Sequence, residues 1–216
     1  MYCSFCEYTG IIKNPDAYIL GKEPLSPCPK CVLETCTCGG VSPYLYIDGG
    51  RVSECACKPV RTRIERINRL INDSEIDRKY RWRFLSEFNV ITPSENRAKA
   101  AAYKIITDFH RTEKGLFLWG NPGTGKTMLS AIILTELIVR YALPGKFVKI
   151  SRNFFGKLKS TFHEGSKLYG LSSVIEQELA DVDVLVVDDF GIQRDSEWEQ
   201  ETLYNLVDAR YEKQRF

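Results

Sequence analysis

The stretch Gly120-Asn-Pro-Gly-Thr-Gly-Lys-Thr127 constrains the fold of this 216-residue chain more than any other. It fits the pattern Gly-x-x-x-x-Gly-Lys-[Ser/Thr] and lies between a short apolar run, Leu116–Trp119, and an apolar segment of helical periodicity, 126–141. Glycine lets the backbone wrap closely around oxygen atoms with its N–H groups turned inward. The start of the following helix adds positive potential. The stretch therefore predicts a strand, a phosphate-binding loop and a helix, in that order.

The loop and a second motif together predict a nucleotide site with Mg²⁺. The expected nucleotide contacts are nine consecutive residues: Gly120, Asn121, Pro122, Gly123, Thr124, Gly125, Lys126, Thr127 and Met128. In such a loop the lysine reaches the β- and γ-phosphates and the Thr127 hydroxyl ligates Mg²⁺. The second motif, Val-Asp-Val-Leu-Val-Val-Asp-Asp-Phe-Gly (182–191), is an apolar strand that ends in two carboxylates. We expect Asp188 to hold Mg²⁺ and Asp189 to act as general base, so Lys126 and Asp189 are the predicted catalytic residues.

The second part of the chain alternates between strand-like and helix-like segments. Thr92, Pro93 and Glu95 form a capping-box pattern that predicts a helix start. After the loop, the pattern predicts a helix over 126–141, a strand at 146–151, helices at 153–162 and about 171–180, a buried strand within 182–191, and a helix over 197–213. Alternation of this kind predicts an α/β fold with a parallel sheet, as in P-loop nucleotide-binding domains.

All eight cysteines lie between Cys3 and Cys57, which predicts a separate metal-held module at the start of the chain. They form two sets of four: Cys3, Cys6, Cys28 and Cys31, in which two Cys-x-x-Cys pairs are 21 residues apart, and Cys36, Cys38, Cys55 and Cys57, which flank a predicted hairpin in 44–57. The spacing favours two structural Zn²⁺ sites without an open coordination position. Cross-braced pairing of the two sets and an iron–sulfur cluster stay open as alternatives, whereas disulfides do not suit a reducing compartment.

These features divide the chain into a cysteine-rich zinc module (1–58), a basic amphipathic linker helix (59–76) and a nucleotide-binding domain (77–216). From Lys58 to Arg83 nine basic residues face four acidic ones, which suits either a nucleic acid, an acidic partner or a solvated helix face. The N-terminus lacks the basic and apolar regions of a signal peptide, and no apolar run is long enough to span a bilayer. We therefore expect a cytoplasmic protein without a membrane partner.

The two phosphate-site motifs and their flanks resemble a known family. Residues 116–129 (LFLWGNPGTGKTML), 183–191 (DVLVVDDFG) and 196–212 (SEWEQETLYNLVDARYE) are similar to AAA+ helicase loaders of the DnaC/DnaI type and to their IstB-like relatives in transposition. The resemblance covers about 75–216 and extends to the Arg210-Tyr211 pair, to which we assign no catalytic role. It implies ATP rather than GTP, Mg²⁺, and ATP-dependent assembly on a hexameric replicative helicase or on single-stranded DNA, with self-association when ATP binds.

Two departures from the family pattern shape the functional hypotheses. The usual Asp-Glu pair is Asp-Asp here, so we expect slow hydrolysis. The chain also stops at Phe216, before the strand that carries the family's polar sensor and before the family's arginine, so we expect a truncated domain. The leading hypothesis is a slow ATPase that loads or remodels a replicative helicase, with the zinc module binding helicase or DNA. The alternatives are an IstB-like transposition ATPase acting on DNA and a non-hydrolysing ATP-dependent adaptor.

Overall fold

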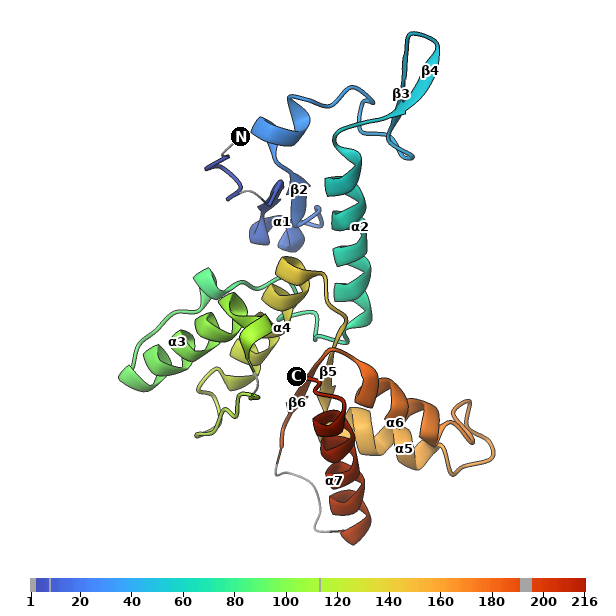
Figure 1. The fold of residues 1–216 in the computed structure, drawn as a ribbon. Coiled ribbons are helices and arrows are strands. Elements are labelled where there is room, and N and C mark those ends of the chain that lie inside the picture. Colours follow the sequence, from blue (N-terminus) through green and yellow to red (C-terminus); the bar gives the residue numbers. More distant parts are fainter. Residues whose placement is uncertain (1–2, 8, 113, 191–195) are drawn as a thin grey trace. The chain divides into compact units, whose positions relative to one another are not determined.

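The computed structural model describes residues 3–7, 9–112, 114–190 and 196–216. The chain separates into two compact units, 1–69 and 70–216, and the boundary between them falls within helix α2 (Lys58–Asp73) (Figure 1). No described helix is both long enough and apolar enough to cross a membrane.

The first unit consists of short elements around its cysteines. Strands β1 (Ile11–Lys13) and β2 (Leu25–Pro27) pair antiparallel, and helix α1 (Pro15–Ile19) lies between them in the sequence. A π-helical turn (Pro29–Leu33) follows, and β3 (Leu45–Asp48) and β4 (Arg51–Glu54) form the predicted hairpin. Its buried cluster contains only two residues besides cysteine, in the set Cys6, Cys28, Val32, Tyr44, Cys55 and Cys57. Cysteines are thus four of the six buried members of this cluster, so a metal ion bound to them would hold it together.

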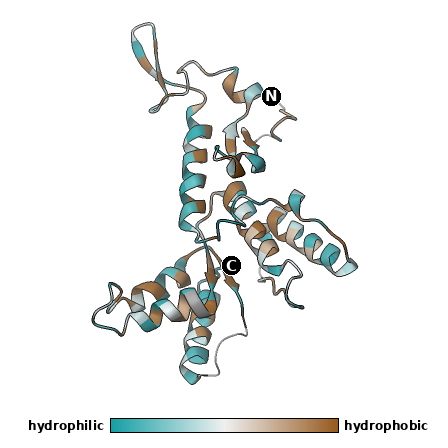
Figure 2. Cartoon of the chain, turned by 180° about the vertical axis from the view of Figure 1, so that it is seen from behind, coloured by the Kyte–Doolittle hydropathy of each residue, from teal (hydrophilic) through white to brown (hydrophobic). Residues whose placement is uncertain are grey.

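Helix α2 has one apolar face, as the spacing of its isoleucines predicts. Ile64, Ile67 and Ile71 are buried, and Figure 2 shows hydrophilic residues along one side of the helix and hydrophobic residues along the other. The helix is longer than the stretch of periodicity at 60–71, because it begins at Lys58 and ends at Asp73.

The second unit is a three-layer α/β arrangement. Strands β5 (Gly145–Lys149) and β6 (Val184–Asp188) pair in parallel, with Lys149 opposite Asp188. Helices α3 (Pro93–Thr107) and α4 (Lys126–Tyr141) lie on one side of the strands, and α5 (Gly156–Ser160), α6 (Ser172–Asp181) and α7 (Glu197–Glu212) lie on the other (Figure 1). The remaining helical segments are short: the 3-10 turns Leu85–Glu87 and Phe109–Arg111 and a π-helical turn, Ile150–Phe155.

Residues alternate between the two faces of the strands. Val148 packs into the cluster formed with α5, α6 and α7, whose buried members include Phe154, Leu158, Leu179 and Leu203. Gly145 faces the other side, where a Cβ atom would come within 2.4 Å of the Leu134 side chain of α4. By the same alternation, the side chains of Lys149 and Asp188 lie on the α4 side of the sheet.

Several predicted elements are confirmed at their bounds. The helix after the glycine-rich loop runs over the predicted residues, Lys126–Tyr141. Thr92 caps α3, with its hydroxyl accepting from the Glu95 N–H while the Glu95 carboxylate accepts from the Thr92 N–H. The predicted helix at 153–162 is divided between the π-helical turn and α5.

The predicted strand Leu116–Trp119 is wrong for the described residues, where this segment has no regular secondary structure. A strand is stable only when its N–H and C=O groups are paired. Within the part of the chain that the structure describes, β5 and β6 form a two-stranded sheet without it. Phe117 and Trp119 are consequently 70% and 85% exposed. On the edge of β6 away from β5, the Leu185 N–H donates to the Phe216 carbonyl at 2.9 Å.

Candidate functional site

The glycine-rich loop ends in a backbone conformation that requires glycine. Gly123 and Gly125 have φ values of 82° and 79°, in the left-handed region, and Gly125 directly precedes the first residue of α4. A Cβ atom on Gly125 would also come within 3.3 Å of the Phe88 ring. The loop therefore turns sharply into the helix, which exposes the free N–H groups of the first helical turn toward the loop.

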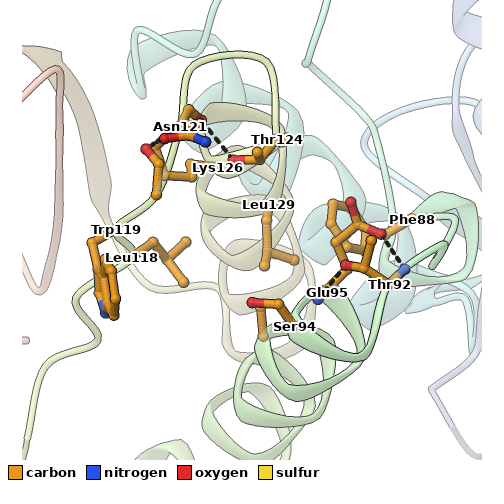
Figure 3. Close-up of a pocket in the computed structure, with 13 residues that line it drawn as sticks. Phe88, Thr92, Ser94, Glu95, Leu118, Trp119, Asn121, Thr124, Lys126 and Leu129 are labelled. Atoms are coloured by element: carbon orange, nitrogen blue, oxygen red, sulfur yellow. Dashed lines mark hydrogen bonds between the residues drawn. The ribbon is translucent and has the colours of Figure 1, made fainter.

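Lys126 lies at the centre of this loop. Its ammonium donates to the carbonyl oxygens of Gly120 and Asn121, both at 2.8 Å, and the Thr124 hydroxyl donates to the Asn121 carbonyl at 2.9 Å (Figure 3). Hydrogen bonds from an ammonium to an anion are stronger than those to neutral carbonyl groups, so Lys126 can exchange these two contacts for an anion bound in the loop.

Thr127 and Asp188 are brought together from positions 61 residues apart. The Thr127 hydroxyl donates to the Asp188 carboxylate at 3.1 Å, which joins the first turn of α4 to the end of β6. Burial raises the pKa of Asp188, and the neighbouring charge of Asp189 adds to this shift, while the Thr127 hydrogen bond opposes it. A hydroxyl and a carboxylate oxygen at this spacing are hard ligands of the kind that Mg²⁺ takes, so the pair fits this ion.

Asp189 differs from Asp188 although the two residues are adjacent. Its φ is 59°, in the left-handed region, and its side chain is exposed. Aspartate tolerates this conformation better than most residues that carry a Cβ atom. The chain turns immediately after β6, so the two carboxylates have different surroundings.

A cavity of about 280 Å³ lies beside the loop. On one side it is lined by Leu118, Trp119, Gly120, Asn121, Thr124, Gly125, Lys126 and Leu129, and on the other by Phe88, Thr92, Ser94, Glu95 and Ala98 (Figure 3). The sequence prediction missed the second set, the two residues before the loop and Leu129. It included Pro122, Gly123, Thr127 and Met128, which do not line the cavity. The signal that could have indicated this second wall is the aromatic Phe88, which lies shortly before the strongly capped start of α3. The start of a helix that packs close to the loop can form the opposite wall of the cavity.

The eight cysteines form two groups of four, each of cysteines that are consecutive in the sequence. Cys3, Cys6, Cys28 and Cys31 form the first, and Cys36, Cys38, Cys55 and Cys57 form the second; within each group all four sulfur atoms lie within 4.8 Å of one another. The cross-braced alternative is therefore not the arrangement found among the described residues.

The sulfur spacing matches a single tetrahedral ion. Zn–S bonds of about 2.3 Å place the sulfur atoms of a tetrahedral site about 3.8 Å apart. The Cys3–Cys28 and Cys6–Cys31 sulfurs are 3.8 Å and 3.5 Å apart, and the Cys38–Cys57 sulfurs 3.5 Å apart. A multi-iron cluster would occupy the space between its ligands and hold them farther apart. Both groups therefore fit a zinc module.

The pKa values of the thiols in the second group are shifted in opposite directions. A hydrogen bond from the Cys57 N–H, outweighing burial and aided by Thr37, lowers the pKa of Cys55 to about 5. Burial raises the pKa of Cys57 to about 12, and contact with the other thiols adds to the shift. Four thiolates at this spacing repel one another unless a cation lies between them, which is a further reason to expect a metal ion.

Comparisons with known proteins agree with this geometry. The replicative helicase loader DnaC of Escherichia coli strain K12 is 27% identical over 155 residues, which cover 71% of this chain and 60% of the relative. YdaV, an uncharacterised protein of the same strain, is 28% identical over 147 residues, 67% of this chain and 56% of the relative. The chain thus spans somewhat more than half the length of these curated relatives.

Solved structures give the same fold. A crystal structure of the DnaC helicase loader superposes with a TM-score of 0.55 at 26% identity, covering 64% of this chain and 76% of that chain. A structure of a Streptococcus pyogenes serotype M3 protein superposes with a TM-score of 0.53 at 23% identity, covering 68% and 74%, and supports the fold alone. The family model of the IstB-like ATP binding protein matches residues 63–216. Because that match covers well over half of the sequence, and because the loop and the Thr127–Asp188 pair have the expected geometry, the chain belongs to the IstB-like ATP-binding family.

Proposed function

We propose that this protein is a slow ATPase that loads or remodels a replicative DNA helicase. The observation that carries the proposal is the meeting of Thr127 with Asp188 beside a glycine-rich loop closed around Lys126, in a chain similar to the helicase loader DnaC. ATP would lie in the loop, with its base beside the cavity between the loop and the start of α3. Family membership supports ATP binding. The roles of the individual residues are proposed from their chemistry and their positions.

The chain's own residues would share the work as follows. The loop N–H groups and the first turn of α4 bind the phosphates, and the Lys126 ammonium leaves the Gly120 and Asn121 carbonyls to contact the β- and γ-phosphates. Thr127 and Asp188 would hold Mg²⁺, which when bound neutralises phosphate charge. Asp189 orients the attacking water and accepts its proton. The shorter side chain of aspartate, compared with glutamate, supports slow turnover.

Binding of a fluorescent ATP analogue to wild-type protein and to Lys126→Ala tests the site. Lys104→Ala on α3 is the matched control, because it removes an exposed lysine outside the cavity lining. We expect binding to be lost only in Lys126→Ala. Wild-type protein that fails to bind the analogue would contradict the proposal.

For the first unit we propose two structural Zn²⁺ ions and a docking role on the helicase. The closeness of four sulfur atoms in each group supports the ions, and similarity to a helicase loader supports the partner. Light scattering on mixtures with the hexameric replicative helicase, with and without ATP and Mg²⁺, would test docking. A complex formed by wild-type protein and lost in Cys28→Ser supports it, whereas no complex under any nucleotide condition contradicts it.

One observation favours a second candidate, an adaptor that binds ATP without hydrolysing it. Asp189 is exposed, and its carboxylate is attached to a left-handed backbone position directly after β6. Turnover measured with Lys126→Ala as the blank separates the two functions, because hydrolysis at this site must disappear in that variant. Binding without Lys126-dependent turnover would establish the adaptor. Assembly on duplex DNA in place of helicase binding would favour a transposition ATPase.

A further inference from the structure

The segment that follows α2 lies along the free edge of β5. The Phe147 N–H donates to the Ser74 carbonyl at 2.7 Å, so residue 74 pairs with the strand on the side away from β6. Ser74 is completely buried, and its hydroxyl donates to the Ile71 carbonyl at 2.8 Å; Ile76 is only 1% exposed. These contacts fix residues 74–77 beside the strand whose last residue is Lys149.

Two acidic residues of this segment pair with different lysines. Glu75 pairs with Lys157 at 2.9 Å, away from the end of β5, and with Lys146 at 3.7 Å. Asp77 pairs with Lys149 at 2.5 Å, and both side chains are partly exposed, at 41% and 27%. The segment therefore places one carboxylate next to the last lysine of the strand.

Lys149 is also a cationic neighbour of Asp188 in the sheet, and its charge already opposes the rise in the pKa of Asp188. The two are register partners in adjacent strands and project toward α4, at a strand separation of about 4.8 Å. The flexible four-carbon stem of lysine can reach a carboxylate at that distance. The hydrogen bond with Asp77 raises the pKa of Lys149 more than burial lowers it, so the amine remains a cation at neutral pH.

We propose that Asp77 is a positioning residue of the nucleotide site, which holds the Lys149 ammonium away from Asp188 and so leaves that carboxylate free for Mg²⁺. An ammonium paired with Asp188 would compete with the divalent ion for the same oxygen atoms and would repel it. The Asp77–Lys149 pair removes the competitor. The inference rests on the proposed nucleotide-binding function, and it assigns to residue 77 a role that neither the loop nor the β6 motif supplies.

A Mg²⁺ titration tests the inference through binding rather than turnover. The Mg²⁺ concentration at half-maximal binding of a fluorescent ATP analogue is measured for wild type, Asp77→Asn, Lys149→Met and the double variant. We expect Asp77→Asn to raise this concentration about tenfold, the effect of one ion pair gained by the competitor. Lys149→Met should need no more Mg²⁺ than wild type, and the double variant should return to within about twofold of it.

Glu75→Gln is the matched control, because it removes the other carboxylate of the same segment without releasing Lys149. Its Mg²⁺ midpoint should equal that of wild type. The inference is overturned if Asp77→Asn leaves the midpoint unchanged, or if the double variant stays as impaired as Asp77→Asn, since Asp77 would then not act through Lys149. Wild-type protein that binds no analogue at any Mg²⁺ concentration overturns the proposed function and this inference with it, whereas normal wild-type binding with an unshifted Asp77→Asn overturns this inference alone.

Discussion

Replacing Arg210 by methionine should destabilise the second unit, because this side chain joins three elements. Arg210 is 7% exposed. Its guanidinium donates to the carbonyl oxygens of Leu179 at 2.6 Å and Val182 at 2.8 Å, and also to the Phe216 carbonyl. The first two carbonyls belong to the end of α6, where a helix has acceptors without helical partners and a negative dipole end. Methionine, an unbranched side chain of similar length, would keep most of the packing of the arginine stem but would remove every hydrogen-bond donor.

The size of the effect follows from these contacts. Each buried carbonyl left without a donor costs about 1–3 kcal/mol. Part of this loss is offset because methionine need not be desolvated as a cation; burial lowers the pKa of Arg210 to about 10, where it is still charged at neutral pH. We therefore expect a net loss of about 3 kcal/mol. For a unit of this length that corresponds to a fall in Tm of about 6–12 °C.

Tryptophan fluorescence is a selective assay, because all three tryptophans of the chain, Trp82, Trp119 and Trp198, belong to the second unit. Lys213→Met is the matched control: it removes a more exposed ion pair with Asp181 from the end of the same helix and should lower Tm far less. Equal melting temperatures for the two variants would refute the reasoning. Loss of ATP turnover in Arg210→Met at unchanged Tm would instead give this residue a functional role.

Three further predictions concern the metal sites and the sheet. Metal analysis should find two Zn²⁺ per chain, and Cys28→Ser should lose one of them without changing the tryptophan-detected transition; full occupancy in that variant would contradict the cluster assignment. Because burial raises the pKa of Asp188, the Mg²⁺ concentration for half-maximal ATP-analogue binding should rise as the pH falls, starting above the pH at which an ordinary aspartate protonates; an equal pH response in Asp188→Asn would argue against this origin. Gly145→Val should lower stability by about 1–3 kcal/mol, since its Cβ would come within 2.4 Å of Leu134, and a denaturant midpoint equal to that of wild type would show that α4 can move aside.

The sequence predicts best what depends on neighbouring residues. The bounds of α4 follow from a glycine before Lys126 and an apolar segment that ends at Tyr141, and the start of α3 follows from the Thr92 and Glu95 cap. The β3–β4 hairpin follows from its Asp-Gly-Gly turn. In each case the signal and the structure lie within one turn or one element, so no distant contact is needed to decide between alternatives.

Features that depend on contacts between distant residues are harder to predict from the sequence. An apolar run such as Leu116–Trp119 has strand propensity, but whether it becomes a strand depends on a partner that its own residues do not specify. The favoured grouping of the cysteines into two consecutive sets is confirmed, but excluding the cross-braced alternative needs the structure, because Cys-x-Cys and Cys-x-x-Cys pairs are compatible with more than one pairing. The Asp77–Lys149 pair joins positions 72 residues apart and has no sequence pattern at all.

Position 189 shows how backbone and chemistry act on one residue. From the sequence, aspartate in place of glutamate implies slow hydrolysis because its side chain is shorter. The structure adds a second constraint, since φ at this position is 59°, which aspartate tolerates better than glutamate. The turn that starts there also ends β6 just after Asp188, which leaves that side chain against Thr127. Aspartate thus suits the turn at position 189, whereas glutamate would reach farther toward a water molecule. The proposed slow turnover follows from this backbone turn, which gives the carboxylates of Asp188 and Asp189 separate roles.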